Sequence, residues 1–380
     1  MVKKKILVFI DWYLPGYKAG GPIQSCANLV AHLNDSYDFS VVTRDADYCE
    51  LKPYPDVKSN AWNILPDGTK VYYISQDKLN RKIIKEIIAA ENFDVVYLNG
   101  IYSLYFSLLP LYYLKRKHSK LIVIAARGML AESALSIKKT KKKFFLRASK
   151  LTGMFNNVVF HATTSTEAKD IKIQFGKKVK IKVAPNLPKK EMNLPFLSKI
   201  KEQGFMKLIN IARIAPEKNL KYALEVLKKV KGKVEFDIYG PIYNTDYWKE
   251  CLALIKVMPP NIKVNYKQSI ESDKIPGLFF AYHFMLLPTR GENFGHTILE
   301  SLAASCPVII SDQTPWKNLK NKKTGWDISL STPAEFIDII EKCIEMDQQE
   351  YDQWSENAFL FALEVINDKE VLEENKKLFV

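Results

Sequence analysis

Two glutamates eight positions apart, in the stretch ENFGHTILE, are the residues of this sequence best suited to holding a polar ligand. Glu292 stands in a loop-like segment, whereas Glu300 lies in a run whose apolar residues have helical spacing. A helix that begins near Gly295 presents unpaired amides and the positive end of its dipole, and both attract phosphate. Glu300 then lies about 7.5 Å further along the helix axis. The spacing predicts one bound nucleotide sugar, with Glu300 at the ribose and Glu292 at the transferred sugar.

The stretch INIARIAPEKNL adds two cations to this prediction. A strand ends at Ala212, so Arg213 lies at its carboxyl end, and Lys218 follows five positions later. A departing diphosphate gains negative charge, which fixed cations can neutralise. Arg213 can hold two phosphate oxygens at once, while Lys218 acts as a point charge. Arg213, Lys218 and Glu292 are therefore the predicted catalytic residues.

Each of these groups also has a structural interpretation. Arg213 and Lys218 could belong to a solvated loop. Glu300 could lie on the solvent side of a helix whose core face consists of Ile298, Leu299, Leu302 and Ala303.

The chemistry is expected to need no metal and no other cofactor. The segment DADY, from Asp45 to Tyr48, has the form of an Asp-x-Asp metal motif, but a pair of loop acids is the preferred interpretation. Five cysteines are scattered without a C-x-x-C pair. That pattern argues against a zinc site and for a reducing compartment.

Several segments together resemble a known family. The spacing Arg213-x4-Lys218, then FDIYGP, then LLPTRGENFGHTILESLAASCPVIISDQTPW, is similar to the carboxyl-terminal domain of family 4 retaining glycosyltransferases, also described as glycosyl transferases group 1. In the first half, GYKAGGPIQSCANLVAHL, AARGMLAESALSIKKTKKK and HATTSTEAKDI match the order of the same family. The resemblance implies a GT-B fold, a nucleoside diphosphate sugar donor and retention of anomeric configuration.

The resemblance also implies roles for individual positions in the second half. Arg213 and Lys218 would bind the donor diphosphate and Glu300 the ribose. The donor sugar would be held by Glu292 and by the backbone that follows it. The further donor-site positions are Asn293, Phe294, Gly295, His296, Thr297 and Gly240.

In the first half, the resemblance points to positions near the phosphates or the acceptor. Gly20 and Gly21 would let backbone approach the ligand closely. Arg127 stands where the family often has histidine, and an arginine there could contact an anionic acceptor. His161 ends a strand and is a further candidate, with a purely structural histidine as the alternative.

The order of elements predicts the fold class. Short β-branched runs alternate with stretches of helical period, the pattern of parallel sheets with crossover helices. We expect an α/β protein of the GT-B class, with two Rossmann-like doubly wound domains facing each other across a cleft. Residues 1–188 would bind the acceptor and be completed by a terminal helix at 362–380. Residues 189–206 would be a linker, and residues 207–361 would bind the nucleotide sugar.

The charge is concentrated in the first half of the chain. Residues 1–195 hold 32 Lys and Arg against 16 Asp and Glu, whereas residues 196–380 hold 24 against 26. Seven cations lie between Lys138 and Lys150, with Phe144, Phe145 and Leu146 interleaved. Such a helix is typical of contact with an anionic membrane. Nucleic-acid binding and a solvated lysine face are the alternatives, but no nucleic-acid motif is recognised.

These features predict a hexosyltransferase that uses a UDP- or GDP-sugar and a glycan or lipid-linked acceptor in surface polysaccharide or lipopolysaccharide synthesis. No apolar run approaches the roughly 20 residues of a membrane-spanning helix, so a cytoplasmic protein peripheral on the inner face of the membrane is expected. Two rival functions remain open, a nucleotide-sugar epimerase of the same architecture and a basic nucleic-acid-binding protein.

Overall fold

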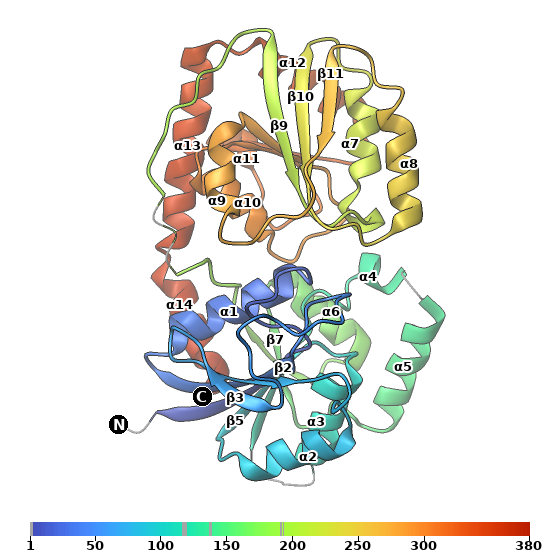
Figure 1. Cartoon of the computed structure of the whole chain (residues 1–380), viewed down its shortest axis with the longest axis vertical. Coiled ribbons are helices and arrows are strands. Elements are labelled where there is room, and N and C mark those ends of the chain that lie inside the picture. The colour runs from blue at the N-terminus through green and yellow to red at the C-terminus, as the bar shows by residue number, and fades with distance from the viewer. Residues whose placement is uncertain (1–2, 116–119, 137–138, 191, 193) are drawn as a thin grey trace. The chain divides into compact units, whose positions relative to one another are not determined.

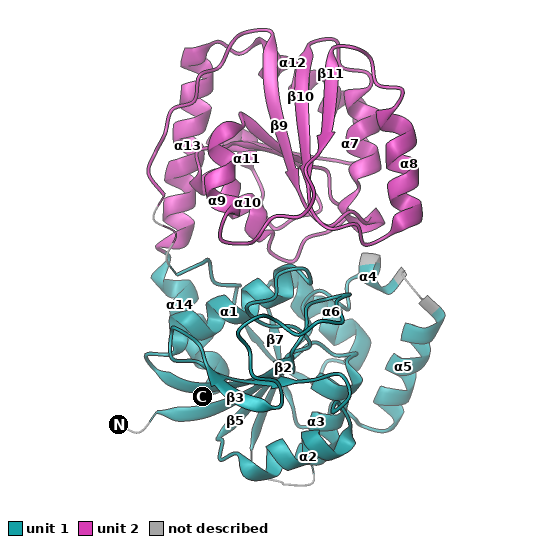
Figure 2. Cartoon of the chain, in the orientation of Figure 1, with its two compact units in different colours: residues 1–190, 368–380 teal, residues 191–367 magenta. Residues whose placement is uncertain are grey.

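A computed structural model describes residues 3–115, 120–136, 139–190, 192 and 194–380. The chain divides into two compact units (Figure 2). Unit 1 consists of residues 1–190 and 368–380, and unit 2 consists of residues 191–367. Each unit is built around its own sheet (Figure 1).

Unit 1 contains an eight-stranded sheet in the order β3-β4-β2-β1-β5-β6-β7-β8. Every pair is parallel except β3 with β4. The strands are β1 (Lys4–Phe9), β2 (Tyr37–Arg44), β3 (Ala61–Ile64), β4 (Lys70–Ile74), β5 (Val95–Asn99), β6 (Leu121–Ala125), β7 (Val159–Ala162) and β8 (Lys180–Val183).

Helices cover both faces of this sheet because the central strands are apolar on both sides. Ile6 and Val8 of β1 pack with α1 and the C-terminal residues, whereas Leu7 and Phe9 pack into the core under α2, α3, α5 and α6. The helical elements are α1 (Gly21–Leu33), α2 (Arg81–Ala90), η1 (Leu104–Leu108), α3 (Leu109–Leu114), α4 (Glu132–Ser136), α5 (Lys139–Leu151), α6 (Ser165–Phe175), α14 (Lys369–Lys376) and η4 (Lys377–Phe379).

Unit 2 contains a six-stranded sheet, parallel throughout, in the order β11-β10-β9-β12-β13-β14. Its strands are β9 (Phe205–Ile211), β10 (Lys233–Tyr239), β11 (Ile262–Tyr266), β12 (Phe284–Leu287), β13 (Val308–Ser311) and β14 (Gly325–Ile328). Its helical elements are η2 (Pro216–Lys218), α7 (Leu220–Leu227), α8 (Thr245–Ile255), α9 (Ile275–Leu278), η3 (Phe279–Ala281), α10 (His296–Ala303), α11 (Leu319–Lys322), α12 (Pro333–Glu345) and α13 (Gln348–Ile366).

The strand orders place one topological switch point in each unit. In unit 1, β1 lies between β2 and β5, and in unit 2, β9 lies between β10 and β12. Ligands of open parallel sheets bind beyond the carboxyl ends of the strands at such points. The residues that follow β1 and β5, and those that follow β9 and β12, are therefore the positions to inspect for function.

The predicted two-domain α/β architecture is found, and two of its strands, β3 and β14, have only weak strand signals in the sequence. β3 is a short antiparallel edge strand with partly exposed side chains, so it lacks the apolar run of a buried strand. β14 is also only four residues long and begins with a glycine.

The positions at which the chain passes from one unit to the other differ from the predicted domain boundaries. The terminal crossing falls at 367–368 rather than at 362, because Ala358 and Ala362 anchor α13 in the core of unit 2. The predicted linker 189–206 already includes the start of β9. Lys199 also fixes that segment to unit 2, since its ammonium group donates to the carbonyl oxygens of Ala304 and Ser305 at 2.8 and 2.6 Å.

Within the described ranges, every helix is too short or too polar to cross a membrane.

Candidate functional site

Arg213 lies two residues beyond β9, at the switch point of unit 2. Its guanidinium carbon lies 4.8 Å from the centre of the Tyr243 ring, and its Nη2 lies 3.5 Å from a carboxylate oxygen of Glu217. The side chain remains partly exposed. A stacked guanidinium is held in orientation while its remaining N–H groups can reach a ligand. Tyr243 lies in the loop after β10, and no sequence pattern links it to Arg213. The contact between these two residues could therefore not be predicted from the sequence.

Lys218 and Glu292 form an ion pair, although 74 positions separate them. The loop after β12 is tied to the η2 turn by two further bonds. Thr289 Oγ1 and the Arg290 amide donate to the Glu217 carbonyl oxygen at 3.1 and 2.9 Å. The structure therefore brings the predicted cation and the predicted carboxylate into contact at the carboxyl ends of β9 and β12.

An aromatic contact holds the loop that carries Glu292. The Glu292 amide donates to the Gln313 carbonyl oxygen at 3.0 Å, and Trp316 Nε1 donates to the Phe294 carbonyl oxygen at 2.5 Å. The Phe294 ring lies 5.8 Å from the Trp316 ring and 4.7 Å from the His296 ring. Trp316 is thus a supporting residue that spacing alone did not single out, although it closes the segment that carries the family resemblance.

Gly295 connects this loop to α10. Its φ of 79° lies in the left-handed region, and a Cβ there would come within 2.7 Å of Ile298 Cδ1. The first turn of α10 contains no acidic residue and Gly295 provides no side-chain cap. The first turn of α10 therefore supplies no carboxylate of its own to the positive end of the helix dipole. Asn293 and Thr297, on either side of this junction, are both partly exposed.

Glu300 is buried, with 1% of its surface exposed. The solvent-facing interpretation of this residue is therefore wrong. His296 is buried as well, at the start of the same helix. Because burying a carboxylate is costly unless polar groups or a ligand compensate, an apolar helix is expected to retain one only for a specific purpose.

Gly240 allows the backbone after β10 to approach the backbone of Ala212, the residue before Arg213. Its φ is 140°, and a Cβ at this position would lie 1.9 Å from the Ala212 carbonyl oxygen. Its amide donates to the Gln268 carbonyl oxygen at 2.8 Å. Gly240 therefore fixes the backbone geometry around the site.

In unit 1, the loop with Gly20 and Gly21 is held by one of the DADY acids. Asp47 accepts hydrogen bonds from the amides of Tyr17 and Lys18 at 2.9 and 3.1 Å. Gly20 has a φ of 77°. Gly21 is the first residue of α1, and a Cβ added there would meet no atom within 4 Å. The loop can therefore present its backbone to a ligand at this end of α1.

Asp45, the other DADY acid, accepts a hydrogen bond from Ser59 Oγ at 2.6 Å. Asp45 and Asp47 thus both hold neighbouring loops in place through hydrogen bonds. Among residues 3–115, 120–136, 139–190, 192 and 194–380, no group of three or more His, Cys, Asp or Glu side chains could hold a metal ion.

Arg127 and His161 belong to one buried polar network. Arg127 donates to Asn99 Oδ1 at 2.7 Å, to the Tyr97 hydroxyl at 2.8 Å and to Asn186 Oδ1. Its backbone has a φ of 51°. Within the described part of the chain Arg127 forms no ion pair, so its charge is stabilised by neutral oxygens.

His161 uses both ring nitrogens inside this network. Nδ1 lies 2.9 Å from the Tyr97 hydroxyl and Nε2 lies 2.8 Å from the Ala184 carbonyl oxygen. Because a carbonyl can only accept, Nε2 carries the proton, and Nδ1 accepts from Tyr97, whose oxygen in turn accepts from Arg127. Burial and the nearby Arg127 charge lower the pKa of His161 to about 3. The geometry matches the structural interpretation of His161, and a direct acceptor contact would need this buried side chain to move.

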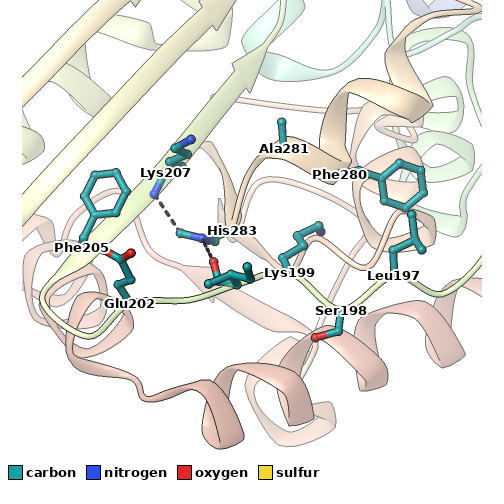
Figure 3. A pocket seen from close by; sticks show the side chains of 10 residues that line it. Leu197, Ser198, Lys199, Glu202, Phe205, Lys207, Phe280, Ala281 and His283 are labelled. Carbon is teal, nitrogen blue, oxygen red and sulfur yellow. Dashed lines mark hydrogen bonds between the residues drawn. The ribbon is translucent and has the colours of Figure 1, made fainter.

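A cavity of about 460 Å³ lies elsewhere in unit 2 (Figure 3). Its lining includes Phe205 and Lys207 at the start of β9 and His283 just before β12. His283 Nδ1 accepts from the Lys207 amide at 3.0 Å, and its Nε2 lies 2.9 Å from the Ile200 carbonyl oxygen (Figure 3). The cavity is therefore at the amino ends of the strands, opposite the end that carries Arg213 and Glu292.

Comparison with solved structures decides the fold class. The structure of Anabaena Alr3699/HepE in complex with UDP and glucose superposes with a TM-score of 0.72 at 16% sequence identity, covering 99% of this chain and 98% of that one. The chain has the GT-B fold. In this GT-B chain, residues 198–361 match the family model described as glycosyl transferases group 1. The matched range contains each predicted donor-site residue.

Curated relatives of this GT-B chain match less than half of its length. The UDP-N-acetylglucosamine–peptide N-acetylglucosaminyltransferase GtfA subunit of Streptococcus agalactiae is 25% identical over 181 residues, which are 46% of this chain and 34% of the relative. The human alpha-1,3/1,6-mannosyltransferase ALG2 is 23% identical over 151 residues, 36% of each chain. The alignments thus span about a third of the length of these relatives.

Proposed function

We propose that the protein is a glycosyltransferase that moves a sugar from a nucleoside diphosphate sugar to a hydroxyl group of an acceptor. The observation that carries this proposal is the convergence of Arg213, Lys218 and Glu292 at the switch point of unit 2. The match of residues 198–361 to glycosyl transferases group 1 supports it.

The donor diphosphate would lie between the basic pair and the first turn of α10. Arg213 would bind two phosphate oxygens. The Lys218 ammonium group, which is paired with Glu292, would also contact the β-phosphate. These cations and the helix amides would neutralise the charge that develops as the sugar leaves, so we propose that transfer needs no metal. Glu300 would accept hydrogen bonds from the ribose hydroxyls once a local movement exposes its buried carboxylate.

Glu292 would orient the donor sugar through hydrogen bonds. Its ion pair with Lys218 would hold the carboxylate in position beside that sugar. We propose a retaining transfer in which the departing phosphate oxygen takes the acceptor proton on the same face of the sugar. Unit 2 would bind the donor and unit 1 the acceptor.

The proposed donor is a UDP- or GDP-hexose, and the proposed acceptor is a glycan or lipid-linked glycan in surface polysaccharide or lipopolysaccharide synthesis. UDP is the nucleotide in the solved Anabaena complex, and the S. agalactiae relative is named for a UDP-sugar. We therefore place UDP-sugars first in a donor screen.

The outer face of α5 supports attachment to an anionic membrane. Phe144 and Leu151, seven residues apart, are 76% and 88% exposed. Helix α5 itself lies at the edge of unit 1 (Figure 1). Exposed Lys143, Arg147 and Lys150 surround them. Apolar side chains flanked by cations favour an interface of anionic lipid headgroups over water.

The structure changes the predicted composition of that face. Leu146 is buried in the core and Phe145 packs against Phe155, with ring centres 6.5 Å apart, so neither can enter a membrane. Lys138, the first cation of the predicted segment, lies outside the described residues. We propose that the protein is cytoplasmic and peripheral on the inner face of the membrane.

Vesicle co-sedimentation tests this attachment. Replacement of Phe144 and Leu151 by serine should abolish binding to vesicles that contain phosphatidylglycerol, whereas the same replacement of Leu51, exposed elsewhere in unit 1, should not. Equal binding by both variants would contradict the proposal.

Release of nucleoside diphosphate tests the proposed activity. The purified protein is incubated with UDP- and GDP-hexoses, with and without a glycolipid extract, and products are followed by proton NMR. We expect acceptor-dependent release of UDP or GDP and an unchanged anomeric configuration in the product. Conversion of the donor to an epimer without acceptor would favour a nucleotide-sugar epimerase.

A further inference from the structure

The switch point of unit 1 carries a cluster of chemically active side chains. Asp11 lies two residues beyond β1, Arg44 is the last residue of β2, and Ser103 follows β5. Ser103 Oγ donates a hydrogen bond to Asp11 Oδ1 at 2.9 Å. Three strands that are far apart in the sequence thus deliver their polar groups to the position where open parallel sheets bind ligands.

The ion pair in this cluster is open. Arg44 Nη2 lies 3.7 Å from Asp11 Oδ1, whereas a charge-assisted hydrogen bond would be about 2.7–2.9 Å long. The side chains of Asp11 and Arg44 are 23% and 28% exposed. Burial is the main influence on Asp11 and raises the pKa of its carboxyl group, although Ser103 and Arg44 oppose this. Neither charge is fully satisfied by its partner, and both remain accessible.

An aromatic wall stands beside the open pair. The guanidinium carbon of Arg44 lies 5.6 Å from the Trp12 ring centre and 5.4 Å from the Phe106 ring centre. Trp12 meets Tyr48 edge to face, with ring centres 5.0 Å apart at 75°. These contacts fix the orientation of the indole, and Trp12 remains partly exposed.

We infer that Trp12, Asp11 and Arg44 form a subsite for the sugar ring of the acceptor. A pyranose has an apolar C–H face that can pack on an indole and a rim of hydroxyl groups. A hydroxyl both donates and accepts, so one hydroxyl lying beside the pair can donate to Asp11 and accept from Arg44. A simple lipid phosphate would use Arg44 but would be repelled by Asp11. The substrate class is therefore a saccharide acceptor, and this inference rests on the proposed function.

A fluorine NMR experiment on the whole chain tests the subsite. The protein is labelled with 5-fluorotryptophan, and Trp12→Phe assigns the Trp12 resonance among the six tryptophans. The probes are the methyl glycosides of glucose, galactose, mannose and N-acetylglucosamine, followed by inorganic phosphate. Trp62, which packs on Tyr72 of β4, gives a control resonance in the same unit.

We expect at least one glycoside to shift the Trp12 resonance saturably while the Trp62 resonance stays in place. Asp11→Asn should weaken that glycoside at least tenfold without changing nucleotide affinity. A structural ion pair alone would leave the Trp12 resonance insensitive to sugars. The inference is overturned if no glycoside moves this resonance, if Asp11→Asn binds the glycoside equally well, or if phosphate alone produces the shift.

Nucleotide titration of the same labelled protein separates this inference from the proposed function. Nucleotide binding without any glycoside response would leave the donor site standing and remove the sugar subsite. A glycoside response without nucleotide binding would remove the proposed transfer reaction, and with it the acceptor role of the subsite.

Discussion

Replacement of His161 by glutamine should make unit 1 less sensitive to acid. A glutamine amide can donate to the Ala184 carbonyl oxygen and accept from the Tyr97 hydroxyl, as the neutral imidazole does. It cannot take up a proton. In the native protein, burial disfavours the charged ring, and protonation would also place a second positive charge beside buried Arg127. For these two reasons the pKa of His161 is lowered to about 3.

The sign and size of the effect follow from this shift. Between about pH 3 and the ordinary histidine value of 6.5, the unfolded chain binds more protons at this position than the folded chain. The free energy of unfolding therefore rises with pH in this window and falls as the solution is acidified. At pH 5, His161 should cost about 2 kcal/mol of stability relative to pH 8.

Urea unfolding at pH 8 and pH 5 measures this difference. At each pH, the free energy of unfolding of His161→Gln is subtracted from that of the native protein. This difference should be smaller at pH 5 than at pH 8 by about 2 kcal/mol. Effects of groups that titrate in both proteins cancel in the comparison. His283→Gln in unit 2 should show a similar dependence on pH, because burial also lowers the pKa of His283, to about 4. A difference for His161→Gln that is independent of pH would refute the assigned network.

Three further predictions concern the donor site. Gly240→Ala should destabilise unit 2 by about 3 kcal/mol or more, since its Cβ would overlap the Ala212 carbonyl oxygen, whereas Gly277→Ala, with open space around it, should be neutral in thermal unfolding. Arg213→Lys should weaken nucleotide binding about tenfold in calorimetry, because lysine cannot hold two phosphate oxygens at once. Arg81→Lys on α2 is the control, and equal nucleotide affinities of the two variants would contradict this prediction. Addition of Mg²⁺ after EDTA should change nucleotide affinity less than twofold, and a larger gain would show that the fixed cations are insufficient.

The positions in the fold of the proposed donor-site residues were largely predictable from the sequence. Arg213, Lys218 and Glu292 occur at spacings set by a strand end and a helix start, and such local patterns are visible in one dimension. The burial of Glu300 was harder to predict, because helical spacing alone is compatible with either face of α10.

The supporting and acceptor-side residues were not predictable in this way. Asp11, Arg44 and Ser103 come from three separate strands, and only the order of strands in the sheet places them together. Tyr243 likewise reaches Arg213 from the end of a neighbouring strand. Contacts of this kind depend on tertiary packing and leave no periodic signal in the chain.

Calorimetric titration with UDP, GDP and dTDP, each in EDTA, tests the proposed nucleotide site in unit 2. The native protein is compared with Arg213→Ala, Glu300→Ala and the control Arg81→Ala. We expect saturable binding of one nucleotide, weakened at least tenfold by the first two substitutions and unchanged by the third. Absence of binding to all three nucleotides, or binding that ignores both Arg213 and Glu300, would contradict the assigned donor site.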